Sequence, residues 1–335
     1  MPHVLLLQAP VRDFYLTMKR TQPYGLACLA ASLRAAGLSV AILDGLARGK
    51  SRIRPLPAEM QYLRAYYPHS DRSPLALFHH YRHFGYSLEY LARRVCEQAP
   101  RLIGISANFS AYADQVLALA RAIKREYPQA PIVVGGHHAT ALPQAVLAEP
   151  AVDYVICGEG EGALVALVRA LEQNLDPRRI PGVGLRTPGG KTHLPETAAA
   201  ADLEHAPPPA VDLIAQGYYQ RRHKRTLVVT ASRGCPFACS YCCMTREGAL
   251  PYRRRTVESV LAEIDVGAAA DSTAVGFIDF EDENLALDKA WLHALLAGIE
   301  ARFGDDPPEL RAMNGLYAPS LDEALVAHMA RAGFK

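Results

Sequence analysis

The sequence predicts an α/β protein with a doubly wound parallel sheet in its first half and three further βα units in its second half. Two observations lead to this prediction. Short apolar runs alternate with longer amphipathic ones over residues 1–175, and the alternation begins again near residue 226. Strands this apolar, separated by helices, are typical of parallel sheets whose two faces are both covered.

The first unit is predicted element by element from that alternation. Strands are expected at residues 3–8, 39–43, 101–106, 131–134 and 152–157, and helices at residues 24–36, 111–127 and 162–172. Gly37 and Pro128 follow the first two helices, and both residue types commonly end a helix. In a sheet of this kind the ligand site lies beyond the carboxyl ends of the strands.

Two segments interrupt the alternation. Residues 49–86 are rich in proline, tyrosine, histidine and arginine, and we interpret them as an insertion that forms a lid or contacts the second unit. Residues 176–225 contain a hairpin with Gly189-Gly190 as its turn, and then three consecutive prolines that no helix accommodates. The expected domains are therefore residues 1–175 and 226–335, joined by a linker over residues 176–225.

The second unit repeats the βα pattern three times. Strands are expected at residues 226–231, 274–280 and 310–313, and helices at residues 257–270, 287–303 and 321–332. The sequence stops at residues 333–335, where a fourth strand would be expected. We therefore expect a protein truncated at its carboxyl end.

Composition narrows the class of protein. Half of the 335 residues are hydrophobic and 21% are charged, and 36 Lys and Arg stand against 34 Asp and Glu, a net charge of +2. No concentrated basic patch indicates a nucleic-acid partner. No apolar run is long enough for a membrane span, and the amino-terminal run is too short for a secretion signal. A cytoplasmic protein without a membrane partner is expected.

The seven cysteines are not expected to form disulfides, because the cytosol keeps thiols reduced. Cys28, Cys96 and Cys157 lie in apolar segments and are expected to fill the core. Glu159 and Glu161 lie in a Gly-Glu-Gly-Glu turn that lacks the Lys-Ser/Thr of a phosphate loop, so they are expected to cap the helix that follows.

The other four cysteines are crowded into nine residues. Cys235, Cys239 and Cys242 have the spacing C-x3-C-x2-C directly after a predicted strand. Thiolates are the ligands of iron–sulfur clusters, and three of them on a four-iron cluster leave one iron open for catalysis. Structural zinc is the alternative, but it requires four ligands, usually as two separated pairs, and no second pair exists. The sequence predicts a [4Fe-4S] cluster, with Cys243 as a bystander.

The motif around these cysteines resembles the signature loop of the radical-SAM superfamily, which uses S-adenosylmethionine (SAM). The likeness lies in the Gly-Cys-Pro entry and in Tyr241 before the third cysteine. Residues 280–285 resemble the acidic segment that lies near the SAM amino group, which implies Glu281 and Asp282 as its partners. Carboxylate caps for the next helix are the alternative. The resemblance covers residues 225–335, the first half of a TIM-like barrel, and also implies SAM contacts for Tyr241 and Asn314.

The resemblance implies a radical chemistry. A reduced cluster passes one electron from an external donor, such as flavodoxin or ferredoxin, to SAM. The sulfonium C–S bond then breaks, and the 5′-deoxyadenosyl radical removes a hydrogen atom from the substrate. The protein supplies orientation and excludes water.

The first unit resembles the cobalamin-binding (B12-binding) domain that precedes many radical-SAM cores. The likeness lies in residues 24–26, 43–44, 104–106, 134–140 and 153–161. It implies cobalamin contacts for residues at strand ends, where glycines let a backbone approach a large ligand: Ser106, Gly135, Gly136, His137 and Gly158. The D-x-H-x-x-G motif, whose histidine ligates cobalt, is absent. The domain therefore either binds cobalamin without a protein histidine or has kept only the fold.

The expected function is that of a cobalamin-dependent radical-SAM methyltransferase acting on an unactivated carbon of a small-molecule or natural-product substrate. A radical cyclisation or rearrangement is the main alternative. Radical methylthiolation would need a second cluster in the first unit, where the cysteines are dispersed. A non-catalytic cobalamin or iron–sulfur sensor would not need the acidic segment. With half of a barrel, these 335 residues alone are expected to be inactive.

Overall fold

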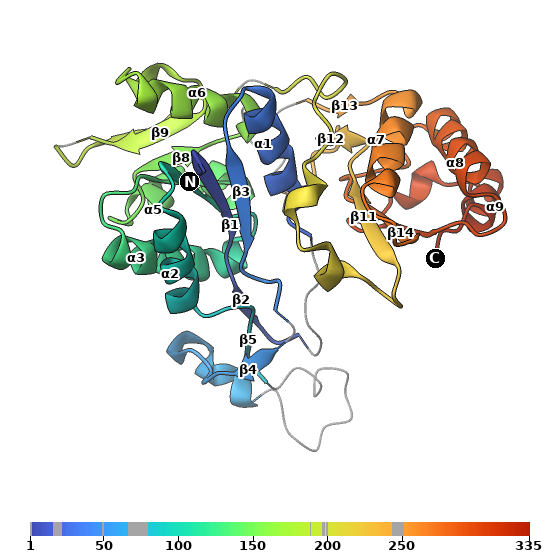
Figure 1. Ribbon diagram of the computed structural model, residues 1–335. Helices are drawn as coiled ribbons and strands as arrows, with labels where there is room; N and C mark the ends of the chain where they lie inside the picture. Colours follow the sequence, from blue (N-terminus) through green and yellow to red (C-terminus); the bar gives the residue numbers. More distant parts are fainter. Residues whose placement is uncertain are drawn as a thin grey trace.

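The computed structural model describes residues 2–15, 22–48, 50–65, 80–187, 189–195, 198, 200–242 and 251–335. Figure 1 shows two α/β units side by side, the first in blue and green and the second in yellow to red. Helix α1 of the first unit faces the second unit. No helix in the described ranges is long and apolar enough to cross a membrane.

The first unit is built on a seven-stranded sheet with the order β10-β9-β8-β7-β6-β1-β3. Its strands are β1 (Val4–Gln8), β3 (Val40–Asp44), β6 (Leu102–Ser106), β7 (Ile132–Gly135), β8 (Tyr154–Ile156), β9 (Val183–Arg186) and β10 (Thr192–His193). The first five strands in this list run parallel, as the apolar runs predict. Strand β9 is antiparallel to β8, and β10 is antiparallel to β9.

Helices cover both faces of this sheet. They are α1 (Tyr24–Ala35), α2 (Leu88–Gln98), α3 (Ala113–Glu126), α4 (His137–Ala141), α5 (Pro143–Leu147) and α6 (Gly160–Glu172), with the 3-10 turn η3 (Ser110–Tyr112) before α3. Leu5 and Leu7 of β1 pack toward α2 and α3, whereas Val4 and Leu6 pack toward α1 and α6. This alternation of side chains is the two-residue period of a strand buried on both faces.

Three of these helices were not predicted. Helix α2 is amphipathic, and its N-cap is Ser87, whose side chain accepts a hydrogen bond from the Tyr90 N–H. It was not predicted because it follows directly on the irregular insertion. Helices α4 and α5 have five residues each, too few to show a helical period.

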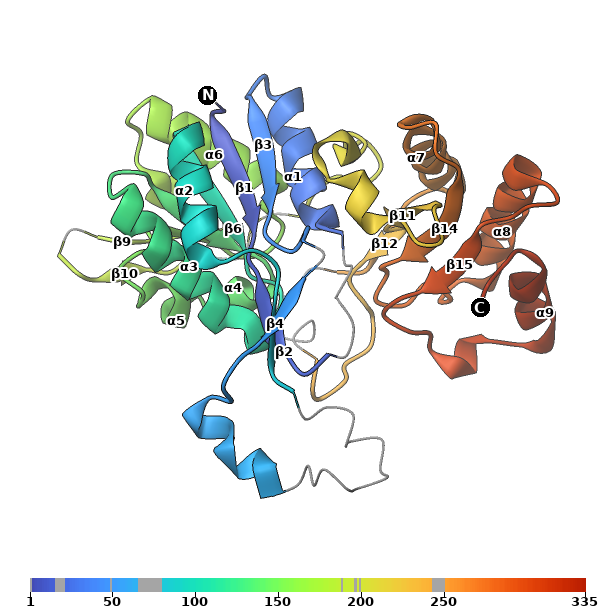
Figure 2. The same ribbon diagram turned by 60° about the horizontal axis from the view of Figure 1, so that its bottom comes forward.

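The insertion lies between β3 and β6, as predicted. Its described part contains β4 (Ser51–Ile53), the 3-10 helix η1 (Ala58–Ala65) and β5 (Arg82–Phe84). With β2 (Val11–Asp13) these strands form a separate antiparallel sheet of order β2-β5-β4, which lies past the end of β1 in Figure 2. Residues 66–79 of the insertion lie outside the described residues.

The predicted hairpin exists, but it is not part of a linker. Strand β9 pairs with β8, with Gly184 opposite Val155, so the first sheet continues to His193. A Cβ on Gly184 would lie 2.8 Å from the Val155 side chain, which explains the glycine at this close approach. The first unit therefore extends beyond the boundary expected at residue 175.

The remaining linker packs against the first unit as 3-10 turns. They are η4 (Pro177–Arg179), η5 (Val211–Leu213) and η6 (Gln216–Tyr219). Tyr219 is buried with Ile214 against Ala27 of α1, and its hydroxyl donates a hydrogen bond to Asp44 at the end of β3. These contacts fix the position from which the chain enters the second unit.

The second unit contains the three predicted βα units. Its parallel strands are β11 (Arg225–Val229), β14 (Val275–Phe280) and β15 (Glu309–Ala312), and its helices are α7 (Val257–Ala269), α8 (Lys289–Phe303) and α9 (Glu323–Arg331), with the turn η8 (Ala318–Ser320). Thr256, Asp288 and Asp322 cap the three helices through their side chains. Leu310 of β15 also forms an isolated parallel β-bridge with Phe334.

A short strand pair interrupts this unit after β11. Strand β12 (Ser232–Arg233) pairs antiparallel with β13 (Arg253–Arg254). The segment between the two strands includes the three predicted cluster ligands, Cys235, Cys239 and Cys242, and residues 234–242 of it, here called the cluster loop, are described.

Candidate functional site

The carboxyl ends of strands from both units meet at one cavity of about 280 Å³. All five residues predicted to contact cobalamin line it: Ser106, Gly135, Gly136, His137 and Gly158. The second unit contributes Thr230, Arg233, Glu281 and Glu283 to the opposite wall. The placement follows from the topology, because parallel strands end at the same edge of a sheet.

The glycines of this cavity differ in what a side chain there would meet. Gly136 has φ +109°, and a Cβ there would lie 2.5 Å from Asn108 Oδ1 and 2.9 Å from the Ala107 carbonyl oxygen. At Gly25, in the first turn of α1, a Cβ would meet nothing within 4 Å. The cavity therefore reaches bare backbone on both sides, which suits a large ligand.

The chemistry of the walls fits cobalamin. Leu6, Leu26, Leu29, Ile156 and Leu164 form an apolar slot between the sheet and helices α1 and α6. Ser106 and Asn108 add a hydroxyl and an amide to the cavity lining. An apolar slot with a few polar groups in its lining is typical of cofactor sites. The sequence interpretation missed Asn108, which follows β6 directly.

The two histidines after β7 differ in setting. His137 is exposed and lines the cavity. His138 is buried, its Nδ1 lies 2.9 Å from the Ser110 hydroxyl, and burial lowers its pKa. His138 therefore belongs to the packing beneath the site rather than to its wall.

A second cavity of about 220 Å³ adjoins the first. It shares Tyr24, Gly25, Ser106, Asn108 and Glu281 with the first cavity and extends to Gln8, Gln22, Phe109 and Tyr112. The Gln8 Oε1 atom is buried and has no hydrogen-bond partner among the residues that the structure describes. Buried amide oxygens normally have a donor, so this end of the cavity is suited to a polar group.

The cluster loop carries its three thiols close together in sequence and accessible to solvent. Cys239 is exposed, Cys235 and Cys242 are partly buried, and the Cys242 N–H donates to the Cys239 carbonyl at 3.0 Å. The donor chemistry fits an iron–sulfur cluster. Within the described ranges, however, no three Cys, His, Asp or Glu side chains are arranged to hold a metal. The three ligands remain a prediction, and Cys243 lies outside the described residues.

The acidic segment after β14 divides into two roles. Glu281 and Glu283 line the first cavity, whereas Asp282 does not. Asp282 is 2% exposed and accepts hydrogen bonds from the Ala231 N–H at 3.1 Å and the Ser232 hydroxyl at 2.5 Å. Burial raises its pKa to about 6. The geometry therefore favours Asp282 as a brace for the cluster loop rather than as a SAM contact.

Helix capping does not explain this segment either. Helix α8 begins at Lys289, and its cap is Asp288, which accepts from the Trp291 N–H. Glu283, which the sequence interpretation passed over, stands beside Glu281 in the cavity wall. The sequence did contain a signal for Glu283: it is two residues after Glu281, and alternate residues at the end of a strand face the same side.

The other two predicted SAM residues lie at the edge of the site. Asn314 donates through Nδ2 to the Glu281 carbonyl at 2.9 Å, so it contacts the cavity wall through the backbone. The Tyr241 side chain is 91% exposed on the cluster loop. Neither lines the cavity, and their SAM contacts remain predictions.

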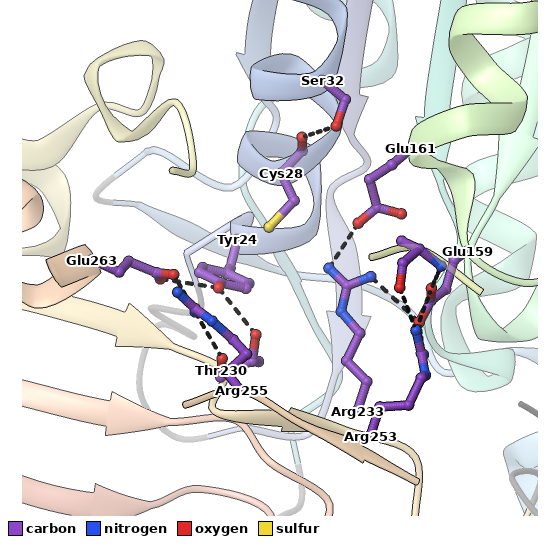
Figure 3. A network of polar contacts seen from close by, with 11 residues as sticks. Tyr24, Cys28, Ser32, Glu159, Glu161, Thr230, Arg233, Arg253, Arg255 and Glu263 are labelled. Atoms are coloured by element: carbon purple, nitrogen blue, oxygen red, sulfur yellow. Dashed lines mark hydrogen bonds and ion pairs between the residues drawn. The ribbon is translucent and has the colours of Figure 1, made fainter. Parts of the chain in front are cut away.

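The wall between the two units is a polar network (Figure 3). Arg233, two residues before Cys235, donates to Glu161 Oε1 at 2.7 Å, and Arg253 donates to Glu159. Glu159 occupies the N-cap position of α6, but its side chain makes no cap hydrogen bond. Both glutamates lie at the start of α6, as expected for acidic residues near a helix N-terminus. The Glu159 carboxylate binds arginines of the second unit instead of the N–H groups of its own helix.

Part of the first unit matches a known family model. Residues 77–168 match the family model described as the B12 binding domain. Cytidylyl-2-hydroxyethylphosphonate methyltransferase of Streptomyces wedmorensis is 28% identical over 316 residues, 85% of this chain and 55% of that protein. Anaerobic magnesium-protoporphyrin IX monomethyl ester cyclase of Cereibacter sphaeroides is 32% identical over 61% of this chain and 33% of its own length.

Two solved structures share the fold. The radical S-adenosylmethionine methyltransferase TsrM of Kitasatospora setae, with tryptophan substrate and a SAM analogue bound, matches 99% of this chain and 58% of its own at a TM-score of 0.67 and 19% identity. The cobalamin-dependent SAM radical enzyme OxsB, with aqua-cobalamin and SAM bound, gives a TM-score of 0.68 at 18% identity and is covered over 43% of its length. This chain spans about half the length of the relatives it matches.

Proposed function

We propose that this chain is the cofactor-binding part of a cobalamin-dependent radical-SAM methyltransferase that acts on a small-molecule substrate. The observation that carries the proposal is the shared cavity. It brings the strand-end residues of a unit that matches the B12 binding domain against Glu281, Glu283 and the base of the cluster loop. A cobalamin and a SAM held there would be neighbours.

The residues of the chain would divide the work between binding and exclusion of water. The apolar slot around Leu26, Leu29 and Leu164 would hold the nucleotide tail of cobalamin, with Ser106 and Asn108 as hydrogen-bonding partners. Glu281 and Glu283 would hold the ammonium group of SAM, since a partly buried cation needs a carboxylate. When bound, the cluster and SAM supply a carbon-centred radical and cobalamin carries the methyl group.

Further parts of the proposal rest on the resemblance to the radical-SAM superfamily. The three βα units would be the first half of a TIM-like barrel, and Cys235, Cys239 and Cys242 would hold the [4Fe-4S] cluster. An external donor such as flavodoxin or ferredoxin would reduce that cluster. TsrM, which shares the fold, has tryptophan as its substrate, in keeping with a small-molecule substrate here.

A radical cyclisation is the second candidate. The relatives include cyclases with up to 32% identity to this chain, alongside several methyltransferases. A labelled methyl group distinguishes the two functions. SAM carrying a deuterated methyl group would leave that group in the product of a methyltransferase and not in the product of a cyclase.

The first test is cofactor loading. The chain is reconstituted anaerobically with iron, sulfide and hydroxocobalamin, and its absorption spectrum and metal content are measured. We expect about four irons, as in a [4Fe-4S] cluster, and one cobalt per chain. Iron should be lost when Cys235, Cys239 and Cys242 are replaced by alanine and kept when Cys28, Cys96 and Cys157 are replaced. Zinc without iron would overturn the proposal, and iron without cobalt would remove methyl transfer from it.

A further inference from the structure

The base of the cluster loop places two positive charges directly opposite one another. In the β12–β13 pair Arg233 faces Arg253, and Ser232 faces Arg254. Like charges at directly opposed positions destabilise an antiparallel pair. Both arginine side chains are also mostly buried, at 24% and 21% exposed. A strand pair of only two residues on each side should not close on its own with this pairing.

The negative charges that balance these two arginines come from the first unit. Glu159 accepts from both terminal nitrogens of Arg253, one of them at 3.2 Å, and lies 3.5 Å from Arg233 Nη1. Glu161 accepts from Arg233 Nη2 at 2.7 Å. The two carboxylates are 12% and 16% exposed, so these ion pairs are shielded from water. Two negative charges therefore neutralise the two arginines.

The Glu159 carboxylate is held in place by further contacts. The Ala201 N–H donates to it at 2.5 Å, and Arg253 also donates to the Ala201 carbonyl at 2.7 Å. Burial alone would raise the pKa of Glu159, but the Arg253 and Ala201 donors and the charge of Arg233 lower it. The carboxylate is thus held ionised, and Figure 3 shows its contacts with Arg253.

We propose that Glu159 and Glu161 form an acidic clamp that closes the base of the cluster loop through Arg233 and Arg253. Both glutamates are positioning residues, and the proposal rests on the assignment of the cluster to that loop. Docking of the first unit then sets the spacing of the cluster ligands, because Arg233 is two residues from Cys235. Glu159, Glu161 and Arg233 also line the first cavity, so an occupant of that cavity would contact the clamp directly.

The test compares charge-only substitutions in the full chain. Glu159→Gln and Glu161→Gln remove one charge each at nearly constant shape. Asp265→Asn is the matched control, because Asp265 pairs with Arg302 on the outer surface of the second unit, with side chains 55% and 34% exposed. Amide hydrogen exchange is measured in the metal-free chain for residues 231–235 and 253–255. Loss of iron to a chelator is measured in the reconstituted chain.

We expect exchange at the loop base and iron loss to become about tenfold faster in each glutamate variant, since a buried charged hydrogen bond is lost. Exchange in α3 should not change. In Glu159→Gln combined with Arg253→Gln, the cross-strand repulsion is removed together with its partner, so exchange should be slower than in Glu159→Gln alone.

Two results would overturn the clamp. One is exchange in the glutamate variants equal to that of Asp265→Asn, and the other is faster exchange in the double variant than in Glu159→Gln alone. If the wild-type chain takes up no iron, the proposed function fails. The exchange experiment on the metal-free chain still decides whether the acidic turn closes the loop.

Discussion

The phenol of Tyr24, the first residue of α1, donates a hydrogen bond of 3.1 Å to Glu263 on α7 and so joins the two units. Thr230, just beyond β11, donates to the same phenol oxygen at 3.0 Å. Arg255 pairs with the other oxygen of Glu263 at 2.5 Å. Burial raises the pKa of Glu263, and the charge of Arg255 and the hydrogen bonds from Arg255 and Tyr24 oppose that rise.

Replacing Tyr24 by phenylalanine should weaken the contact between the units. Thr230 loses its acceptor and Glu263 loses a donor, both at partly buried positions. An unsatisfied buried polar group costs about 1–3 kcal/mol, and we expect a loss of stability in that range. Denaturant unfolding of the purified chain measures it. Tyr90→Phe, at a residue of α2 that is 36% exposed, is the control and should change stability by less than about 0.5 kcal/mol.

A methyl group at Gly25 should obstruct the cavity without straining the backbone. A Cβ at Gly25 or at Gly162 would meet nothing within 4 Å, and both residues lie in helices, yet only Gly25 lines the cavity. Alanine should therefore leave stability unchanged or raise it by up to about 1 kcal/mol at both positions. Gly25→Ala should weaken binding of hydroxocobalamin by about 1–3 kcal/mol, as expected of an added methyl group in a packed site.

Titration of hydroxocobalamin into the two variants makes this comparison. Equal affinity of Gly25→Ala and Gly162→Ala would place the ligand elsewhere. Gly136→Ala should behave differently from both, because its φ of +109° and the close Asn108 oxygen make alanine destabilising. Its loss of stability should be about 1–3 kcal/mol.

Asp282 should make stability depend on pH. Burial raises its pKa to about 6 from an ordinary value of 3.8, hydrogen bonds from Ser232 and Ala231 oppose the rise, and the charge of Glu283 adds to it. The folded state therefore binds a proton more tightly than the unfolded state does. This contribution to stability is complete below about pH 4 and is lost as the pH rises through about 6.

The size of this stability change follows from the rise of about two units in the pKa of Asp282, which corresponds to about 3 kcal/mol. Relative to Asp282→Asn, the wild-type chain should lose up to that amount of stability between pH 4 and pH 7. Urea unfolding across this range measures the difference. Parallel pH profiles for the two chains would show that Asp282 is already ionised at its ordinary pKa in the folded state.

Arg225 should be among the most costly residues to remove from the second unit. It is 2% exposed and donates to four carbonyl oxygens at 2.6–2.9 Å. Those of Gly267 and Ala268 lie in the last turn of α7, and those of Asp271 and Thr273 follow the helix. Leucine would leave these acceptors without their donor, so we expect a loss of at least about 3 kcal/mol in unfolding experiments. Arg302→Leu, which removes an exposed ion pair, should cost less than about 1 kcal/mol.

Sequence patterns predicted the parallel strands and every long helix except α2, because each of these elements has a local, periodic signal. The runs that became β1, β6, β11 and β14 lie within two residues of their expected positions. The predictions failed where the signal was not local. The hairpin around Gly190 was assigned to a linker, since nothing within residues 182–194 reveals that β9 pairs with β8.

The residues of the candidate site likewise divide into those that the sequence predicted and those that depend on contacts between distant segments. Ser106, Gly135 and Gly158 were expected from the resemblance to the cobalamin-binding domain, and the structure brings them to one cavity because parallel strands end at one edge of a sheet. Strand alternation places Glu281 and Glu283 on one side and Asp282 on the other, but the sequence does not reveal which side faces the cavity, because that depends on what packs against the end of β14. Asp282 is bound by Ala231 and Ser232, about 50 residues earlier in the chain.

The sequence by itself determined the order of elements, the C-x3-C-x2-C spacing of the thiols and the glycines at the strand ends, since each depends on near neighbours in the chain. Only the tertiary structure decided how the two units meet. Glu159 could have capped its own helix, but its carboxylate is instead bound by Arg253, 94 residues later. Such pairings are set by packing between distant segments, because a buried charge is stable only where the fold supplies its partner.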